Sequence, residues 1–316
     1  MKNKVSVVMS VYNEKIEWLK DSINSILKQT YESFEFIIIL DNPHNLELKA
    51  YLLNLCEIEE KVKVVINERN LGIVESINRG IELAEGEYIA RMDADDIAVK
   101  ERLEKQVKFL DNNPEIHLVG SKMIFINEEG AKLYEDEYKL KNQEHIIEHL
   151  KYCNAFSHPT FMFRKDTIVK IGKYRNALYA EDYDLCMRLV SQDYKISNIQ
   201  EVLLYYRLRE NGISLGKKKY QITTTLYLQK IYCKSLKKKV DFFREEDLKK
   251  LFRKDDSKLG MFVEKLHIEA IKNKENKIKR AIYTIIVILF SKKYLMYYIK
   301  RAKLKMYLKK INLLYI

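Results

Sequence analysis

The sequence predicts an α/β protein with a mostly parallel sheet, followed by a basic helical C-terminal region. Two observations predict this fold class: short apolar runs alternate with segments of helical periodicity over the first hundred residues, and the charge balance changes sharply near residue 216. The 316 residues include 47% hydrophobic residues and only three prolines. This composition is ordinary for a globular protein with a large core and excludes a disordered chain.

Four apolar runs predict buried strands, at 4–11, 34–40, 62–66 and 87–92. They are continuous rather than alternating, as expected of strands covered on both faces of a parallel sheet. Between and after them, apolar residues recur three and four positions apart. This spacing predicts helices at 14–29, 46–55, 73–84 and 102–110.

The C-terminal third differs in charge from the rest. Residues 217–316 contain 28 Lys+Arg and 9 Asp+Glu, a balance of +19, whereas residues 1–216 carry −7. This shift predicts a boundary at 216/217, with an α/β domain at 1–216 and a basic helical region at 217–316.

The cysteines and the N-terminal segment indicate the cellular compartment in which we expect the protein. No two of the four cysteines are close enough in sequence for a zinc knuckle, and their spacing indicates no disulfide framework. The apolar run 5–11 is too short for a signal peptide and is followed by Tyr-Asn-Glu. We therefore expect a cytoplasmic protein with reduced cysteines.

Polar clusters follow each predicted strand, at 13–14, 41–42, 67–70 and 93–96. Carboxyl ends of parallel strands meet at one edge of a sheet, where ligands bind. The last cluster holds Asp93, Asp95 and Asp96, whose carboxylates repel one another and lose hydration if drawn into the fold. Such a cluster indicates a positively charged partner.

The residues alone leave several interpretations of this cluster. Asp93, Asp95 and Glu104 match three ligand positions of a calcium-binding EF-hand loop. Ile97 and Ala98, however, stand where an oxygen ligand and a glycine are required. Acidic residues are also favoured at the start of any helix. Neither glycine-rich phosphate-binding motif, GxxxxGK[ST] or GxGxxG, occurs.

Three segments together resemble the family 2 glycosyltransferases: SVVMSVYNE (6–14), NLGIVESINRGIELAEGEYIARMDADD (70–96) and YAEDYDLCMRL (179–189). The resemblance covers roughly residues 4–215, and within the family it is strongest to bacterial enzymes that build capsule or lipopolysaccharide. It implies the GT-A fold, a Rossmann-like nucleotide-binding sheet. It also implies inverting transfer of a sugar from a nucleoside diphosphate sugar, most commonly UDP-linked, to a hydroxyl of a growing glycan or lipid-linked saccharide. The alternative is an inactive GT-A-like protein that binds nucleotide or glycan.

The resemblance also implies roles for single residues. Asp95 would bind Mn²⁺ or Mg²⁺ bridging the donor diphosphate, and Asp182 would be the general base, supported by Glu181. Asp96 would cap the following helix. The nucleotide-sugar would contact Val11, Tyr12, Glu14, Asp41, Asn70, Arg79, Asp93 and Ala94. From the residues alone, Glu181 and Asp182 are equally typical of a helix start, and Arg79 of an exposed helix surface.

This chain departs from the family pattern at three places. Ser10 replaces a common proline, and Asp41-Asn42-Pro43-His44 replaces Asp-Asp-Gly-Ser, which leaves base selectivity open. In the segment 205–214, arginines occupy Arg207 and Arg209 where relatives often carry Arg-x-His. One arginine is expected to contact the diphosphate, and this segment offers no histidine as a metal ligand.

The basic region predicts a further partner. The apolar run 281–290 is too short to span a bilayer, which requires about 20 residues. Residues 292–316 carry eight Lys+Arg, no acidic residue, and interleaved aliphatic and aromatic residues. We predict peripheral contact with an anionic membrane surface on its cytoplasmic side. A solvated appendage or a dimer contact remains the alternative, and no nucleic acid partner is expected, because it would leave the acidic N-terminal motifs unexplained.

Overall fold

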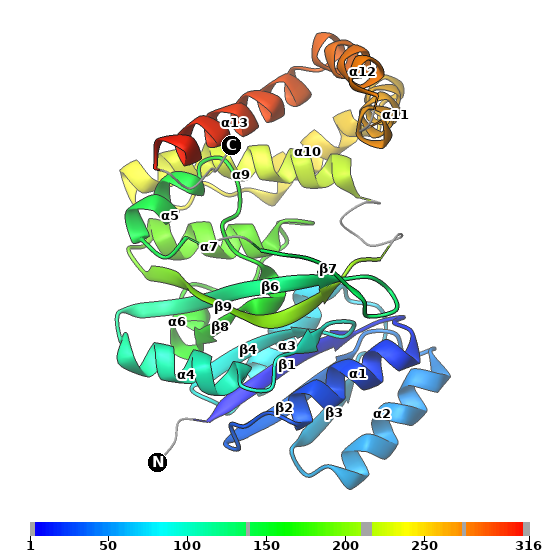
Figure 1. Ribbon diagram of the computed structural model, residues 1–316, viewed down its shortest axis with the longest axis vertical. Coiled ribbons are helices and arrows are strands. Elements are labelled where there is room, and N and C mark those ends of the chain that lie inside the picture. Colours follow the sequence, from blue (N-terminus) through cyan, green and yellow to red (C-terminus); the bar gives the residue numbers. More distant parts are fainter. Residues whose placement is uncertain (1–3, 137–139, 210–216, 274–275, 312–316) are drawn as a thin grey trace. The chain divides into compact units, whose positions relative to one another are not determined.

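The computed structural model describes residues 4–136, 140–209, 217–273 and 276–311 (Figure 1). The chain forms two compact units. The first comprises Met1–Ile147, Ala155–Arg175 and Leu185–Glu210, and the second comprises Glu148–Asn154, Asn176–Asp184 and Asn211–Ile316. The predicted boundary after residue 216 lies outside the described residues and stays a prediction.

The first unit begins with four parallel strands in the spatial order β3-β2-β1-β4. They are β1 (Val5–Val11), β2 (Phe34–Leu40), β3 (Val62–Ile66) and β4 (Tyr88–Asp93). The connecting helices are α1 (Ile16–Leu27), α2 (Leu46–Ile58) and α3 (Ile73–Leu83). All four strands and three helices predicted for this segment are confirmed, with ends that shift by up to three residues.

Beyond β4 the sheet becomes mixed. β8 (Met162–Arg164) pairs antiparallel with β4 and with β6 (Ile116–Ile126), and β9 (Lys195–Arg207) runs parallel to β6. The short strands β5 (Ile97–Ala98) and β7 (Lys132–Glu135) pair antiparallel with β9 and β6. The remaining elements of residues 99–191 are α4 (Arg102–Asn112), α5 (Gln143–His149), η1 (His158–Thr160), α6 (Lys165–Lys170) and α7 (Glu181–Ser191). The α/β class is confirmed.

The sheet is fixed by packing on both faces. One face of β1 packs with the apolar sides of α1 and α4 in a single core cluster. On the other face α3 comes unusually close, since a Cβ atom on Gly80 would lie 2.4 Å from Val8 Cγ1. Each fully buried Val, Leu or Ile side chain contributes about 1.5–3 kcal/mol to the free energy of folding. Packing on both faces therefore holds the carboxyl ends of the strands in fixed positions.

The second unit is helical where it is described. Its C-terminal part contains α9 (Lys218–Lys238), α10 (Glu245–Asp255), α11 (Lys258–Lys272), α12 (Lys277–Phe290) and α13 (Lys292–Lys310). The helical character predicted for this region is confirmed. Ile222, Val263, Val287 and Tyr294 form a small core among these helices. Across the described ranges, no helix combines the length and apolar character needed to cross a bilayer.

Candidate active site

The candidate site lies at the carboxyl edge of the parallel strands. Register pairs Ser10 with Asp93, Val11 with Leu40, and Leu40 with Ile66, so the four strands end side by side. The polar clusters predicted after these strands therefore meet at one edge. Val11 and Ala94 are buried at this edge, and their implied contact with the nucleotide stays a prediction.

Asp41 organises the loop that leads into α3. It is buried, and its Oδ1 accepts hydrogen bonds from Asn67 Nδ2 (2.7 Å) and the Leu71 amide (2.8 Å). Its Oδ2 accepts one from the Gly72 amide (2.8 Å), and Asn70 Oδ1 accepts from the same amide (2.9 Å). The implied contact of Asp41 with the base stays a prediction; in the structure its carboxylate shapes this loop.

Arg79 is held at the same edge. Its Nη1 donates to Asn67 Oδ1 (2.6 Å) and to the Ile66 carbonyl (3.4 Å), and the residue is half-buried. It is therefore not the simple exposed helix arginine considered above. Through Asn67 it belongs to one network with Asp41.

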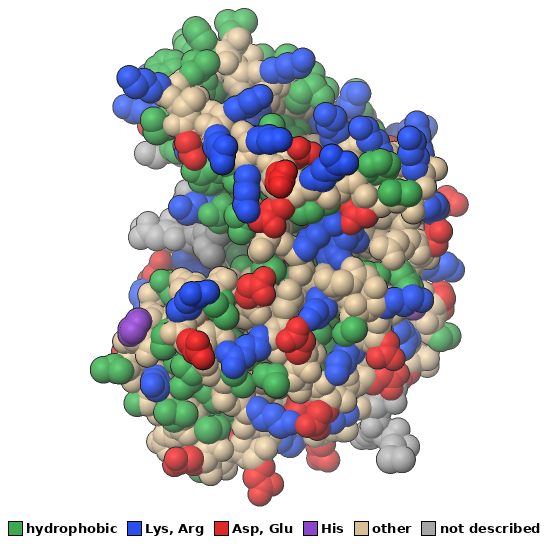
Figure 2. Space-filling view, turned by 180° about the vertical axis from the view of Figure 1, so that it is seen from behind, with side chains coloured by type: hydrophobic (Ala, Val, Ile, Leu, Met, Phe, Trp, Pro, Cys, Tyr) green, Lys and Arg blue, Asp and Glu red, His purple; other side chains and the backbone are tan. Residues whose placement is uncertain are grey.

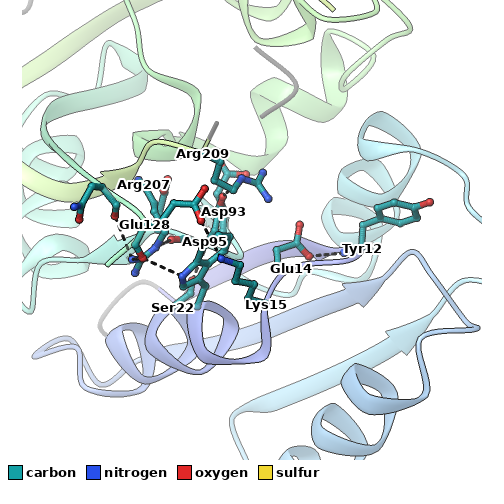
Figure 3. A network of polar contacts seen from close by, with 12 residues as sticks. Tyr12, Glu14, Lys15, Ser22, Asp93, Asp95, Glu128, Arg207 and Arg209 are labelled. Atoms are coloured by element: carbon teal, nitrogen blue, oxygen red, sulfur yellow. Dashed lines mark hydrogen bonds and ion pairs between the residues drawn. The ribbon is translucent and has the colours of Figure 1, made fainter. Parts of the chain in front are cut away.

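Tyr12 and Glu14 follow β1 (Figure 3). The Tyr12 amide donates to Glu14 Oε2 (2.7 Å), while the Tyr12 side chain is 44% exposed. Burial raises the pKa of Glu14, and the Asp93 carboxylate adds to this shift. Beside them, Asn13 Oδ1 accepts from Asn42 Nδ2 (2.6 Å), which links the loops after β1 and β2.

Asp93 is supported by an arginine that the sequence analysis missed. The Arg91 side chain is almost fully buried, and its Nη2 lies 2.5 Å from Asp93 Oδ1. Burial acts to raise the pKa of Asp93, but the Arg91 guanidinium, together with His158 and Arg209, holds the pKa below its ordinary value. The available signal was a charged residue inside the otherwise apolar strand 87–92.

Asp95 is contacted by two arginines, Arg207 at the end of β9 and Arg209 just after it (Figure 3). Arg209 Nε lies 2.8 Å from Asp95 Oδ2, whereas Arg207 Nε donates to the Asp95 carbonyl (2.9 Å). Burial and the adjacent Asp93 raise the pKa of the Asp95 carboxyl to about 7, and Arg209 opposes this shift. Arg209 therefore forms an ion pair with the Asp95 carboxylate, and Arg207 fixes the main chain of the loop.

The expectation that Asp96 caps the next helix is wrong. Asp96 is fully buried, and its Oδ1 accepts a hydrogen bond from the Arg207 amide (2.9 Å). The chain first forms β5, which pairs with β9, and α4 begins only at Arg102. Asp96 thus connects the loop after β4 to β9.

The two arginines predict different effects on stability. Arg207 is buried and also donates to the Glu128 carbonyl (2.7 Å), so Arg207→Gln should leave buried acceptors unsatisfied. We expect it to lower the free energy of unfolding by about 3 kcal/mol in urea titrations. Arg209→Gln is the matched control, because the Arg209 side chain is 30% exposed, and should change stability by less than about 1 kcal/mol. Equal losses in both variants would contradict this assignment.

Glu181 and Asp182 lie in the first turn of α7, where acidic side chains are favoured. Asp182 Oδ2 accepts a hydrogen bond from Asn154 Nδ2 (2.8 Å), and both residues belong to the second unit. Tyr183 next to them is buried and donates from its hydroxyl to the Leu150 carbonyl. The start of α7 is therefore anchored, and Asn154 orients the Asp182 carboxylate.

Three carboxylates at the edge of the sheet have the chemistry that a hard divalent cation prefers. Within the residues that the structure describes, no group of three or more His, Cys, Asp or Glu side chains is arranged to hold a metal ion. Glu14, Asp93 and Asp95 nevertheless interact electrostatically, and the crowding of negative charge contributes to the raised pKa values of Glu14 and Asp95. Carboxylate oxygens are ligands that Mg²⁺ and Mn²⁺ prefer, and substrate phosphates commonly complete such sites.

Comparison with known proteins identifies the family. The chain belongs to glycosyl transferase family 2, whose model matches residues 6–172. It is 38% identical over 238 residues to the uncharacterized glycosyltransferase MJ1057 of Methanocaldococcus jannaschii, covering 74% of this chain and 80% of that protein. It is 34% identical over 203 residues to the amylovoran biosynthesis glycosyltransferase AmsE of Erwinia amylovora, covering 64% and 75%.

A more distant relative and a solved structure add to this. The Escherichia coli UDP-Gal:alpha-D-GlcNAc-diphosphoundecaprenol beta-1,3-galactosyltransferase is 28% identical over 224 residues, covering 70% of this chain and 80% of that protein. The crystal structure of S. aureus TarS 1–349 matches with a TM-score of 0.56 at 18% identity, covering 78% of this chain and 69% of that chain. The similarity to TarS shows a shared fold, and the predicted GT-A class is confirmed.

Proposed function

We propose that this glycosyltransferase is a metal-dependent, inverting enzyme that uses a UDP-sugar as donor. In this proposal it extends a glycan or lipid-linked saccharide during bacterial surface-polysaccharide biosynthesis. The observation that carries the proposal is the grouping of Glu14, Asp93 and Asp95 at the carboxyl edge of the sheet, with Arg209 on Asp95. The names of two relatives, for amylovoran biosynthesis and for a UDP-galactose-dependent transferase, support the pathway and the donor.

The edge of the sheet would bind the donor. Tyr12 offers an exposed ring beside the loops shaped by Asp41 and Arg79, where a nucleoside could stack. Asp95 would hold the cation, with Glu14 and Asp93 contributing negative charge around it. A bound divalent cation would neutralise charge on the diphosphate leaving group. Arg209 carries a guanidinium suited to bidentate contact with phosphate oxygens.

The acceptor would be activated by Asp182. Its carboxylate, oriented by Asn154, would take the proton of the acceptor hydroxyl as that oxygen attacks the anomeric carbon opposite the diphosphate. The C–O bond to the diphosphate breaks as the new glycosidic bond forms, so the anomeric configuration inverts without a covalent enzyme intermediate. Glu181 would orient Asp182 and the helix start.

Arg209 forms an ion pair with the Asp95 carboxylate, which the cation would need as a ligand. Removing this arginine should therefore change the affinity for metal. Arg209→Gln removes a competing positive charge from Asp95 and should raise the affinity for Mn²⁺ alone by about tenfold. Turnover of the donor should fall, because the same arginine would serve the diphosphate. Calorimetry with MnCl₂ measures the first effect. Lys15→Gln is the control with the same charge loss, since Lys15 pairs with Glu128 (2.9 Å); an equal gain there would contradict a specific role for Arg209.

We also propose that the protein works at the cytoplasmic surface of a membrane. One relative acts, by its name, on a sugar linked to diphosphoundecaprenol, a lipid-linked acceptor. The C-terminal region carries a balance of +19 over residues 217–316, which suits anionic lipid. An acceptor held in a bilayer requires the enzyme to approach that surface.

A donor screen tests the proposal as a whole. Purified protein is incubated with UDP-, GDP- and dTDP-sugars, with MnCl₂ or with EDTA, and release of the nucleoside diphosphate is measured. We expect hydrolysis of a UDP-sugar that EDTA abolishes. Tight nucleotide binding without any turnover, in the presence of acceptors, would favour the inactive nucleotide-binding alternative.

A further inference from the structure

An apolar face of α12 is exposed. Ile278, Ile282, Ile285 and Leu289 are 75%, 51%, 57% and 76% exposed, and their spacing of four, three and four residues places them along one side of the helix. We call these four residues the α12 apolar face. Val287 on the same helix is fully buried in the core of the second unit, so α12 is anchored by one side and presents the other outward.

The neighbouring helix extends this face. Phe290 at the end of α12 and Phe262 near the start of α11 are 56% and 51% exposed, and their rings meet edge to face at 6.5 Å. Leu259 and Met261 on α11 are also about half exposed. Figure 2 shows hydrophobic side chains gathered among Lys and Arg side chains over the helices that Figure 1 labels α11 and α12.

The charge around the α12 apolar face is positive. Lys277, Lys279 and Arg280 stand exposed in the first turn of α12, beside Ile278. The sequence from residue 276 to residue 316 contains no acidic residue. A second copy of the chain docking here would bring these cations against their own counterparts, which costs free energy. An anionic surface is the complementary partner.

We propose that α12 lies in the interface of an anionic bilayer, with the α12 apolar face among the lipid chains and Lys277, Lys279 and Arg280 on the headgroups. A helix of 14 residues is about 21 Å long, enough to lie in the interface and too short to span it. The sequence alone placed this contact in residues 292–316. In α13, however, Tyr294 is buried and Lys293 forms an ion pair with Asp255 (2.5 Å). Part of α13 therefore packs against the other helices of the second unit and does not face outward. This inference rests on the proposed membrane location and names the element responsible.

Vesicle sedimentation of the full-length protein tests the assignment. Vesicles of phosphatidylcholine with 30% phosphatidylglycerol are compared with pure phosphatidylcholine, for wild type and for Ile282→Gln/Ile285→Gln/Leu289→Gln. These side chains are exposed, so the fold should persist, and the partition coefficient on anionic vesicles should fall about 100-fold. In Lys277→Gln/Lys279→Gln/Arg280→Gln the partition coefficient on anionic vesicles should fall about fivefold per substituted residue. Its dependence on salt concentration should also be weaker than in wild type.

A matched control replaces equally exposed apolar residues of α2, in the first unit. Leu46, Leu53 and Ile58 are 74%, 41% and 70% exposed, and Leu46→Gln/Leu53→Gln/Ile58→Gln should bind vesicles like wild type. Unchanged binding of the α12 variant, or an equal loss in the control, would overturn the proposal. So would a wild-type dimer that the α12 variant converts to monomer while vesicle binding persists. Activity on a soluble acceptor should be unaffected by the α12 changes, and vesicle binding by a protein that transfers no sugar would refute only the proposed chemistry.

Discussion

Asp182→Asn is expected to lower the rate of sugar transfer by about 10²–10⁴-fold, the usual loss when a general base is removed. Asparagine keeps the size of the side chain and its contact with Asn154, but it cannot accept the proton of the acceptor hydroxyl. Binding of donor and Mn²⁺ should stay within about threefold of wild type, because these ligands are assigned to the edge of the sheet. Single-turnover transfer beside donor calorimetry measures both.

Glu181→Gln is the matched control for this variant. Successive residues at a helix start point in different directions, so we expect only one of the two carboxylates to reach the acceptor. Glu181→Gln should lose about tenfold or less. If Glu181→Gln transfers no sugar while Asp182→Asn remains active, Glu181 is the general base and Asp182 the supporting residue. Normal transfer by both would place the base elsewhere.

Asp95→Asn should abolish Mn²⁺-dependent transfer, with a loss of about 10³-fold or more. The carboxylate is buried beside Asp93, where an amide cannot supply the charge that a hard cation requires. The folded state should be at least as stable as wild type in thermal unfolding, because the change removes a buried negative charge next to Asp93. Calorimetry should show loss of Mn²⁺ binding in the absence of donor.

Asp96→Asn provides the comparison for Asp95→Asn. Its carboxylate is also buried, but it accepts from the Arg207 amide and serves the loop. Asparagine retains that acceptor, so Mn²⁺ binding should persist. Asp95→Asn with wild-type Mn²⁺ affinity and turnover would remove this residue from the metal site.

The first four strands were predictable because each is a continuous apolar run that ends in polar residues. In such a segment the local sequence pattern predicts the same structure that burial in the core favours. The meeting of the polar clusters at one edge of the sheet follows from the parallel topology of these strands. The metal-binding role proposed for Asp95 came from resemblance, since three closely spaced acids alone are equally typical of a helix start. The structure adds their burial and their arginine partners.

The arginines were harder to predict because their contacts join distant parts of the chain. Arg207 reaches Asp95 and Asp96 across 112 and 111 positions. No local pattern distinguishes it from Arg209, yet one is buried against main-chain groups and the other pairs with the carboxylate. The same holds for Asp96, whose role depends on β5 pairing with a strand formed a hundred residues later. Exposure of the α12 apolar face likewise depends on which side of that helix the bundle buries.

The anomeric configuration of the first product tests the central claim most directly. Wild-type protein, Mn²⁺, an α-linked UDP-sugar and a soluble acceptor glycoside are followed by proton NMR from the start of the reaction. We expect a β-linked product formed in step with UDP, and no product in EDTA. An α-linked product would contradict direct displacement and the role of Asp182 as base, and product formed at full rate in EDTA would contradict the metal site at Asp95.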